Sequence, residues 1–123
     1  MTYKKPVSKE IVVKAIIDSI ENEDGHVDIK ARYLKGFQTP EKIIRKGKDQ
    51  EGYTPDVTVQ DEDRIELYEV VLDEKVELDK WRLFSLFTSK GKRHFNIVTP
   101  EEQLPRVRDL LKSSHISARL IYF

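Results

Sequence analysis

Apolar residues recur at helical spacing in three segments of the chain. Between residues 8 and 20 they form a single face, and Ser8 stands where a helix N-cap is expected. A second helix is predicted over residues 77–89, whose apolar residues form a wide surface. A third is predicted over residues 99–112, because this segment opens with a cap residue, a proline and two acids.

Short apolar or alternating segments between these helices predict strands. They lie at residues 27–34, 57–59, 65–72, 95–98 and 115–123. The second and third of them form a hairpin that turns at residues 61–63. A short helix is also predicted from Glu41, because Thr39 and Pro40 resemble a cap followed by a proline in the first turn.

The order of these elements predicts an α/β fold. Helices alternate with strands in the second half of the chain, which implies crossover connections between parallel strands. We therefore expect a central mixed β-sheet that is flanked by helices on both faces. At 123 residues, we expect residues 1–123 to form a single domain.

Composition narrows the possible chemistry. The chain has 22 Lys and Arg residues and 22 Asp and Glu residues, so its formal net charge is zero. The overall charge therefore does not attract a nucleic acid. Basic runs at 42–48 and 90–94 are either local phosphate contacts or ordinary solvated loops. The absence of cysteine excludes disulfides, thiol nucleophiles and thiolate zinc sites. No apolar run approaches the roughly 20 residues of a membrane span, so we expect a cytoplasmic protein with no membrane partner.

The hairpin carries the most informative acids of the chain. Asp56 follows Pro55 at the start of the first strand, and Glu69 lies late in the second. Alternation places Glu69 on the same face as the apolar Leu67 and Val71, where an unpaired carboxylate is costly. Two carboxylates on neighbouring strands suit Mg²⁺, which takes oxygen ligands. The alternative is that Glu69 pairs with a Lys or Arg and that Asp56 caps a turn.

With these acids in place, the order of elements resembles the PD-(D/E)XK nuclease superfamily, which has a restriction-endonuclease-like fold. The resemblance covers residues 8–123 and implies that Asp56 and Glu69 bind a divalent metal. Glu10 falls where many members carry an additional metal-binding Glu. The family's Lys, which activates or positions the attacking water, is replaced by Val71. Some members move this basic residue to the following helix, which makes Lys80 the substitute candidate and Lys75 a poorer one; the alternative is that Lys80 is simply solvated.

Two hypotheses of function follow. The resemblance implies a Mg²⁺-dependent endonuclease that acts on DNA or RNA, with Lys80 steadying the charge that develops in the reaction. The departure at Val71 favours a catalytically inactive module of the same fold, which binds nucleic acid or protein and forms a homodimer through the apolar strand at 115–123. Converging acids in an open cleft favour the first hypothesis. A Glu69 that is bonded to a Lys or Arg with no open space favours the second.

Overall fold

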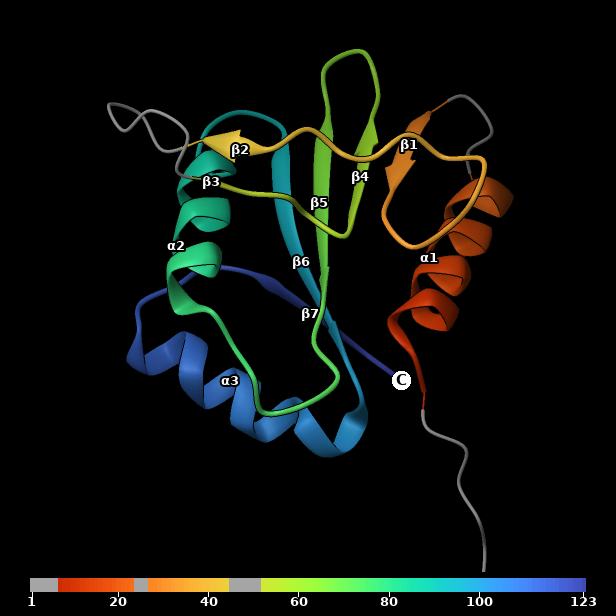
Figure 1. Ribbon diagram of the computed structural model, residues 1–123. Helices are drawn as coiled ribbons and strands as arrows, with labels where there is room; N and C mark the ends of the chain where they lie inside the picture. The colour runs from red at the N-terminus through yellow and green to blue at the C-terminus, as the bar shows by residue number, and fades with distance from the viewer. Residues whose placement is uncertain (1–6, 24–26, 45–51) are drawn as a thin grey trace, which may run out of the picture.

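The computed structural model describes residues 7–23, 27–44 and 52–123. Its helices are α1 (Lys9–Glu23), α2 (Leu78–Phe87), the 3-10 turn η1 (Glu101–Gln103) and α3 (Leu104–Ser113). Its strands are β1 (Asp28–Ala31), β2 (Ile43–Ile44), β3 (Gly52–Tyr53), β4 (Val57–Gln60), β5 (Ile65–Val70), β6 (Arg93–Thr99) and β7 (Arg119–Tyr122). The predicted α/β class is confirmed (Figure 1).

Five strands form one mixed sheet in the order β1-β4-β5-β6-β7. The pairs β1–β4 and β4–β5 are antiparallel, whereas β5–β6 and β6–β7 are parallel. Parallel neighbours need a crossover, and α2 supplies it between β5 and β6 while α3 supplies it between β6 and β7. Strands β2 and β3 form a separate antiparallel pair.

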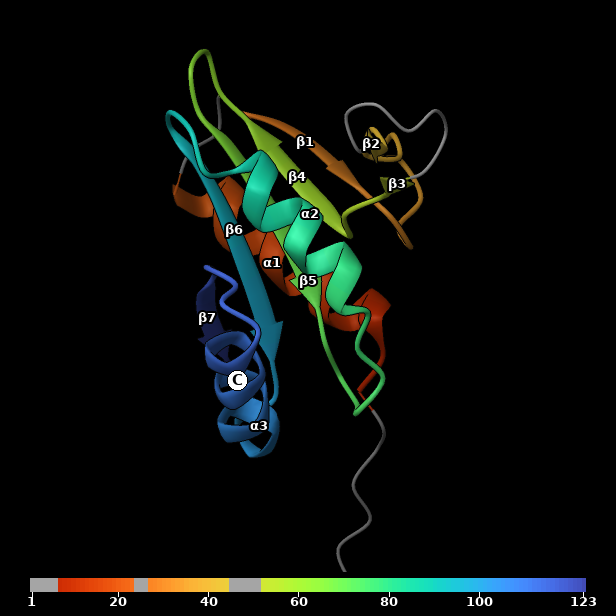
Figure 2. The same cartoon turned by 90° about the vertical axis from the view of Figure 1, so that its left-hand side faces the viewer.

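Helices cover both faces of the sheet, as the pattern predicts. Figure 2 shows α2 in front of the strands and α1 behind them. A cluster under α1 includes Val13, Ile17 and Val57, and a second cluster under α2 and α3 includes Trp81 and Phe84. Alternation along β5 divides its residues between the two clusters, so the sheet is buried on both sides.

Local chemistry accounts for three of the element ends. The N–H of Ile11 donates to Ser8 Oγ at 3.3 Å, which confirms the predicted cap of α1. The hairpin turn closes through Asp61 N–H to the Arg64 carbonyl oxygen at 2.9 Å. The third predicted helix divides into η1 and α3, and Pro105 stands in the first turn of α3, where its missing N–H costs nothing.

The helix predicted from Glu41 is wrong for the residues that the structure describes there. Residues 41 and 42 form no regular element, and Ile43 pairs with Tyr53 across β2 and β3. Ile43 and Tyr53 both pack against the cluster under α2, and this tertiary contact outweighs the local helix signal. The remainder of the basic run, residues 45–48, lies outside the described residues.

The longest described helix, α1, has 15 residues. Within the three described ranges, no helix has both the length and the apolar character that crossing a membrane requires.

Candidate functional site

The register of β4 and β5 brings Asp56 and Glu69 together. Val57 pairs with Tyr68, and the Asp56 N–H donates to the Tyr68 carbonyl oxygen at 3.1 Å, which continues the pairing by one residue. Asp56 therefore lies opposite Glu69, with both side chains on the face that α2 covers. Cross-strand neighbours of this kind have Cβ atoms about 5 Å apart. The two predicted acids thus form one carboxylate pair.

Both carboxylates are buried, and each keeps one oxygen without a hydrogen bond. Asp56 is 0% exposed and Glu69 is 2% exposed. Asp56 Oδ2 accepts the N–H of Val70 at 2.8 Å, but Asp56 Oδ1 and Glu69 Oε1 have no hydrogen-bond donor. A buried acceptor without a donor is costly, and two adjacent carboxylates also repel each other. The pair therefore presents two oxygens that are suited to a further cation or donor.

Three basic side chains surround the pair. Lys80 from α2 forms an ion pair with Glu69 Oε2, and only 16% of the Lys80 side chain is exposed. Lys9 Nζ donates to Asp56 Oδ2 at 3.5 Å, and Arg32 Nη1 lies 4.0 Å from Asp56 Oδ1. The neighbourhood of the two acids is therefore rich in positive charge.

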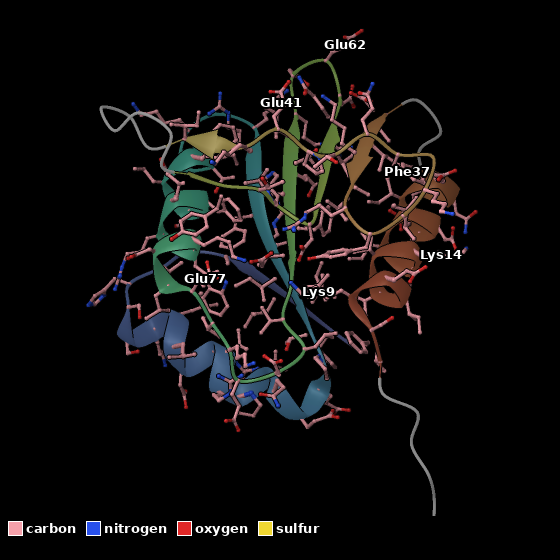
Figure 3. All side chains as sticks on the ribbon, viewed as in Figure 1. Lys9, Lys14, Phe37, Glu41, Glu62 and Glu77 are labelled. Carbon is pink, nitrogen blue, oxygen red and sulfur yellow. The ribbon has the colours of Figure 1, made fainter. Side chains whose placement is uncertain are left out.

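Lys9, which contacts Asp56, lies in the first turn of α1. In this turn the sequence analysis predicted that the neighbouring acid, Glu10, would reach the site instead. Figure 3 shows Lys9 extending from α1 toward the sheet, while Lys14 further along the helix points away from it. Glu10, the predicted third metal ligand, is exposed. Adjacent helical residues point about 100° apart, so only one of Lys9 and Glu10 can face the sheet. Among the described residues, no three acids or histidines converge as a metal-binding group, and Glu10 therefore does not join the pair.

Burial dominates the proton affinity of Glu69. It raises the pKa of Glu69 to about 8, with the adjacent Asp56 adding to the rise and Lys80 opposing it. Burial alone would lower the pKa of Lys9, but attraction to Asp56 and Glu69 outweighs it, and the net shift is upward. Burial and Asp56 therefore favour the protonated form of Glu69, Lys80 favours its charged form, and Lys9 stays charged near neutral pH.

An open cleft reaches Glu69 of the acid pair. Its volume is about 630 Å³, and Lys9, Glu69 and Lys80 line it together with residues 70–77 of the loop that enters α2. Lys75, the weaker substitute for the family's Lys, is among these lining residues. The cleft brings solvent beside Glu69, whose side chain is itself only 3% exposed. The Lys80 ion pair, in contrast, is the feature expected of a structural acid.

Val71, which directly follows β5 and stands where the resembled family has its Lys, offers no basic group beside Glu69. Its side chain is buried in the cluster under α2, and its N–H donates to the Val98 carbonyl oxygen at 2.9 Å. Lys80 approaches the same carboxylate from α2 instead. The structure therefore brings together Asp56, Glu69 and Lys80, and it adds Lys9 and Arg32, which the sequence analysis did not identify.

Helical periodicity could have identified Lys9, because Lys9 lies one turn before the buried Val12 and Val13. Arg32 lies in a loop and offered no comparable pattern. Comparisons of the chain with protein-family models, with curated proteins and with solved structures find no match.

Proposed function

We propose that the chain has a restriction-endonuclease-like fold and acts as a divalent-metal-dependent nuclease of the PD-(D/E)XK type, with its basic residue moved to α2. The order of elements supports the proposal, because α1 precedes three antiparallel strands and α2 then crosses over to the parallel strand β6. The observation that carries it is the buried cross-strand pair of Asp56 and Glu69, with Lys80 against it and a cleft beside it.

The acid pair fits a hard divalent cation. Mg²⁺ is commonly held by one or two carboxylates while it keeps several waters, so two acids are enough. Asp56 Oδ1 and Glu69 Oε1, the two buried oxygens without a donor, would hold it. A bound Mg²⁺ supplies a Lewis acid for a phosphoryl oxygen and lowers the pKa of a coordinated water. In this proposal Lys80 leaves Glu69 enough to place its ammonium group beside the phosphoryl oxygens.

A second candidate function rests on the same ion pairs. Lys80 and Lys9 already neutralise Glu69 and Asp56, and Val71 cannot donate a hydrogen bond from its side chain. A domain of this kind would bind DNA or RNA, or a second copy of itself, without cutting. Its acids would then govern stability alone.

The deciding experiment is cleavage of labelled single- and double-stranded DNA and RNA with Mg²⁺ or Mn²⁺. Asp56→Asn and Glu69→Gln keep the shape of each side chain and remove its charge, and both are expected to reduce cleavage to background. Asp63→Asn is the matched control, because Asp63 is an exposed acid on the same hairpin whose partner is Lys92.

Binding of Mn²⁺, followed by calorimetry on the same proteins, separates the two functions. The nuclease proposal expects binding by the parent that is lost in Asp56→Asn and Glu69→Gln and kept in Asp63→Asn. A well-folded parent that cuts none of the substrates and binds no Mn²⁺ would favour the non-catalytic module.

A further inference from the structure

Tyr33, in the loop after β1, combines an unusual backbone with an exposed ring. Its φ is +72°, a left-handed conformation that a bulky residue adopts only at a cost. The residue is nevertheless 44% exposed, so burial of the ring does not offset that cost fully. Strain of this kind persists where the surrounding structure imposes it, and it is common at ligand sites.

The loop that carries Tyr33 is held firmly at both sides. The Ala31 N–H donates to the Gln38 carbonyl oxygen at 2.9 Å, and the Arg32 N–H donates to the Asp56 carbonyl oxygen at 2.9 Å. Leu34 and Phe37 pack against the core cluster under α1. The backbone of the loop is therefore tied directly to Asp56, and its one large exposed ring is Tyr33.

Two cations lie against the ring of Tyr33, and both also belong to the acid site. Lys9 Nζ is 5.7 Å and Arg32 Cζ is 5.1 Å from the ring centroid. The same groups approach the two oxygens of Asp56 at 3.5 and 4.0 Å. Their side chains are 35% and 40% exposed, so both keep donors that are free to meet a phosphate.

Among the described cation–ring contacts, only those of Tyr33 involve cations that also contact Asp56. Arg93 lies 4.5 Å from the ring centroid of Phe87, but Phe87 packs against the cluster under α2 and does not line the cleft at Glu69. Tyr122 is exposed on β7, where it lines an apolar groove beside α1 rather than the charged cleft.

We propose that Tyr33 is a stacking platform for one unpaired base of the nucleic acid, with Arg32 and Lys9 contacting the adjoining phosphate beside the Asp56–Glu69 pair. The proposal rests on the nuclease function proposed above and names its substrate as a strand with an accessible base. Proteins that hold single strands combine basic side chains along the backbone with aromatic rings on which bases stack. In a duplex both faces of each internal base are already stacked, so blunt duplex DNA gains nothing from Tyr33.

The first test is direct binding in the presence of EDTA, which keeps it independent of cleavage. Tyr33→Trp places a fluorophore at the platform, and the parent protein, whose native Trp81 is 1% exposed, serves as the blank for the Trp81 signal. A single-stranded oligonucleotide is expected to quench the new fluorescence on binding, and a blunt duplex is not. Equal quenching by both would overturn the preference for an unpaired base.

Two further variants separate stacking from folding. Tyr33→Phe keeps a ring and is expected to bind single strands like the parent, whereas Tyr33→Gly is expected to bind them about 10-fold more weakly. Glycine adopts the left-handed backbone without strain, so Tyr33→Gly is expected to keep the backbone path of the loop while it removes the ring. Tyr122→Ala is the matched control for an exposed tyrosine elsewhere, and it is expected to change nothing.

The outcomes also separate this proposal from the nuclease proposal. Metal-dependent cleavage with the same KM for single strands in Tyr33→Gly and the parent would overturn the stacking role and leave the nuclease intact. A parent that neither binds nor cuts any oligonucleotide would overturn both.

Discussion

The two ends of the β4–β5 hairpin carry the same kind of ion pair in opposite surroundings. Near the turn, Lys92 Nζ lies 2.8 Å from Asp63 Oδ2, and the two side chains are 71% and 67% exposed. At the other end, Lys80 pairs with Glu69, and the two side chains are 16% and 3% exposed. Water solvates either partner of the first pair when they separate, but it cannot do so for Glu69.

Solvent access, rather than the contact between the charges, decides how much each ion pair contributes to stability. Exposed ion pairs contribute little to stability, because water competes for both charges. Buried pairs recover their desolvation cost only when every oxygen is hydrogen-bonded, and here one oxygen of Glu69 and one of Asp56 are not. An apolar pair would stabilise this part of the sheet at least as well. The proposed metal site would give these two buried oxygens the partner that the fold does not supply.

The largest effect is expected when the buried pair is broken from its basic side. Lys80→Met keeps most of the side-chain length but leaves Glu69 without its cation, and it should lower the free energy of unfolding by about 3 kcal/mol at a pH above 8. Urea unfolding followed by the fluorescence of Trp81 measures this. The loss should shrink at lower pH, because Glu69 can then take a proton. A loss that is the same at all pH values would contradict the assignment of Glu69 as the affected group.

An effect of similar size is expected from pH alone in the parent protein without metal. The pKa of Glu69 is raised from 4.5 to about 8, so between these values the folded state holds a proton that the unfolded state has released. Stability should therefore fall as pH rises through this window, by on the order of 3 kcal/mol, and level off above it. Glu69→Gln should remove this part of the pH dependence. A parent whose stability rises across the same window would show that Lys80 outweighs burial.

The acid pair and its basic neighbours differ in how well they could be predicted from the sequence. Alternation along the strand predicted that Glu69 faces an apolar layer. The hairpin pattern predicted that Asp56 lies on the neighbouring strand, because a short turn fixes the register of the two strands it joins. The resemblance offered Lys80 as a substitute candidate, with a solvated side chain as the alternative, and the structure shows Lys80 paired with Glu69. Lys9 was missed because the prediction selected its neighbour Glu10, and one residue of helical rotation decides which of them faces the sheet. Arg32 lies in a loop, whose path depends on tertiary packing that no periodic pattern encodes.

An intermediate effect is expected at Lys9. Its side chain is 35% exposed and 3.5 Å from Asp56, so water screens the attraction. Lys9→Met should lower the free energy of unfolding by no more than about 1 kcal/mol. The same variant should strengthen Mn²⁺ binding measured by calorimetry, because it removes a positive charge from beside Asp56. Weaker Mn²⁺ binding by a well-folded Lys9→Met protein would show that Lys9 supports the metal site instead of competing with it.

The smallest effect is expected at the exposed pair. Lys92→Met should leave the urea midpoint of unfolding where it is in the parent, because water replaces the lost partner of Asp63 on all sides. Its consequence is confined to proton affinity: Lys92 lowers the pKa of Asp63 through a hydrogen bond and its charge, and the variant should return that pKa toward its ordinary value.

Salt provides the sharpest comparison of the two ends in one sample. The charge attraction that lowers the pKa of Asp63 acts through water, so about 1 M salt should remove much of the shift. The rise in the pKa of Glu69 comes first from burial, which salt does not screen, so its value of about 8 should remain nearly unchanged in the same titration. NMR titration of the side-chain carboxyl groups at low and high salt measures both. If the two acids responded to salt alike, Glu69 would be exposed to solvent, and the argument that its burial prepares it for a cation would be wrong.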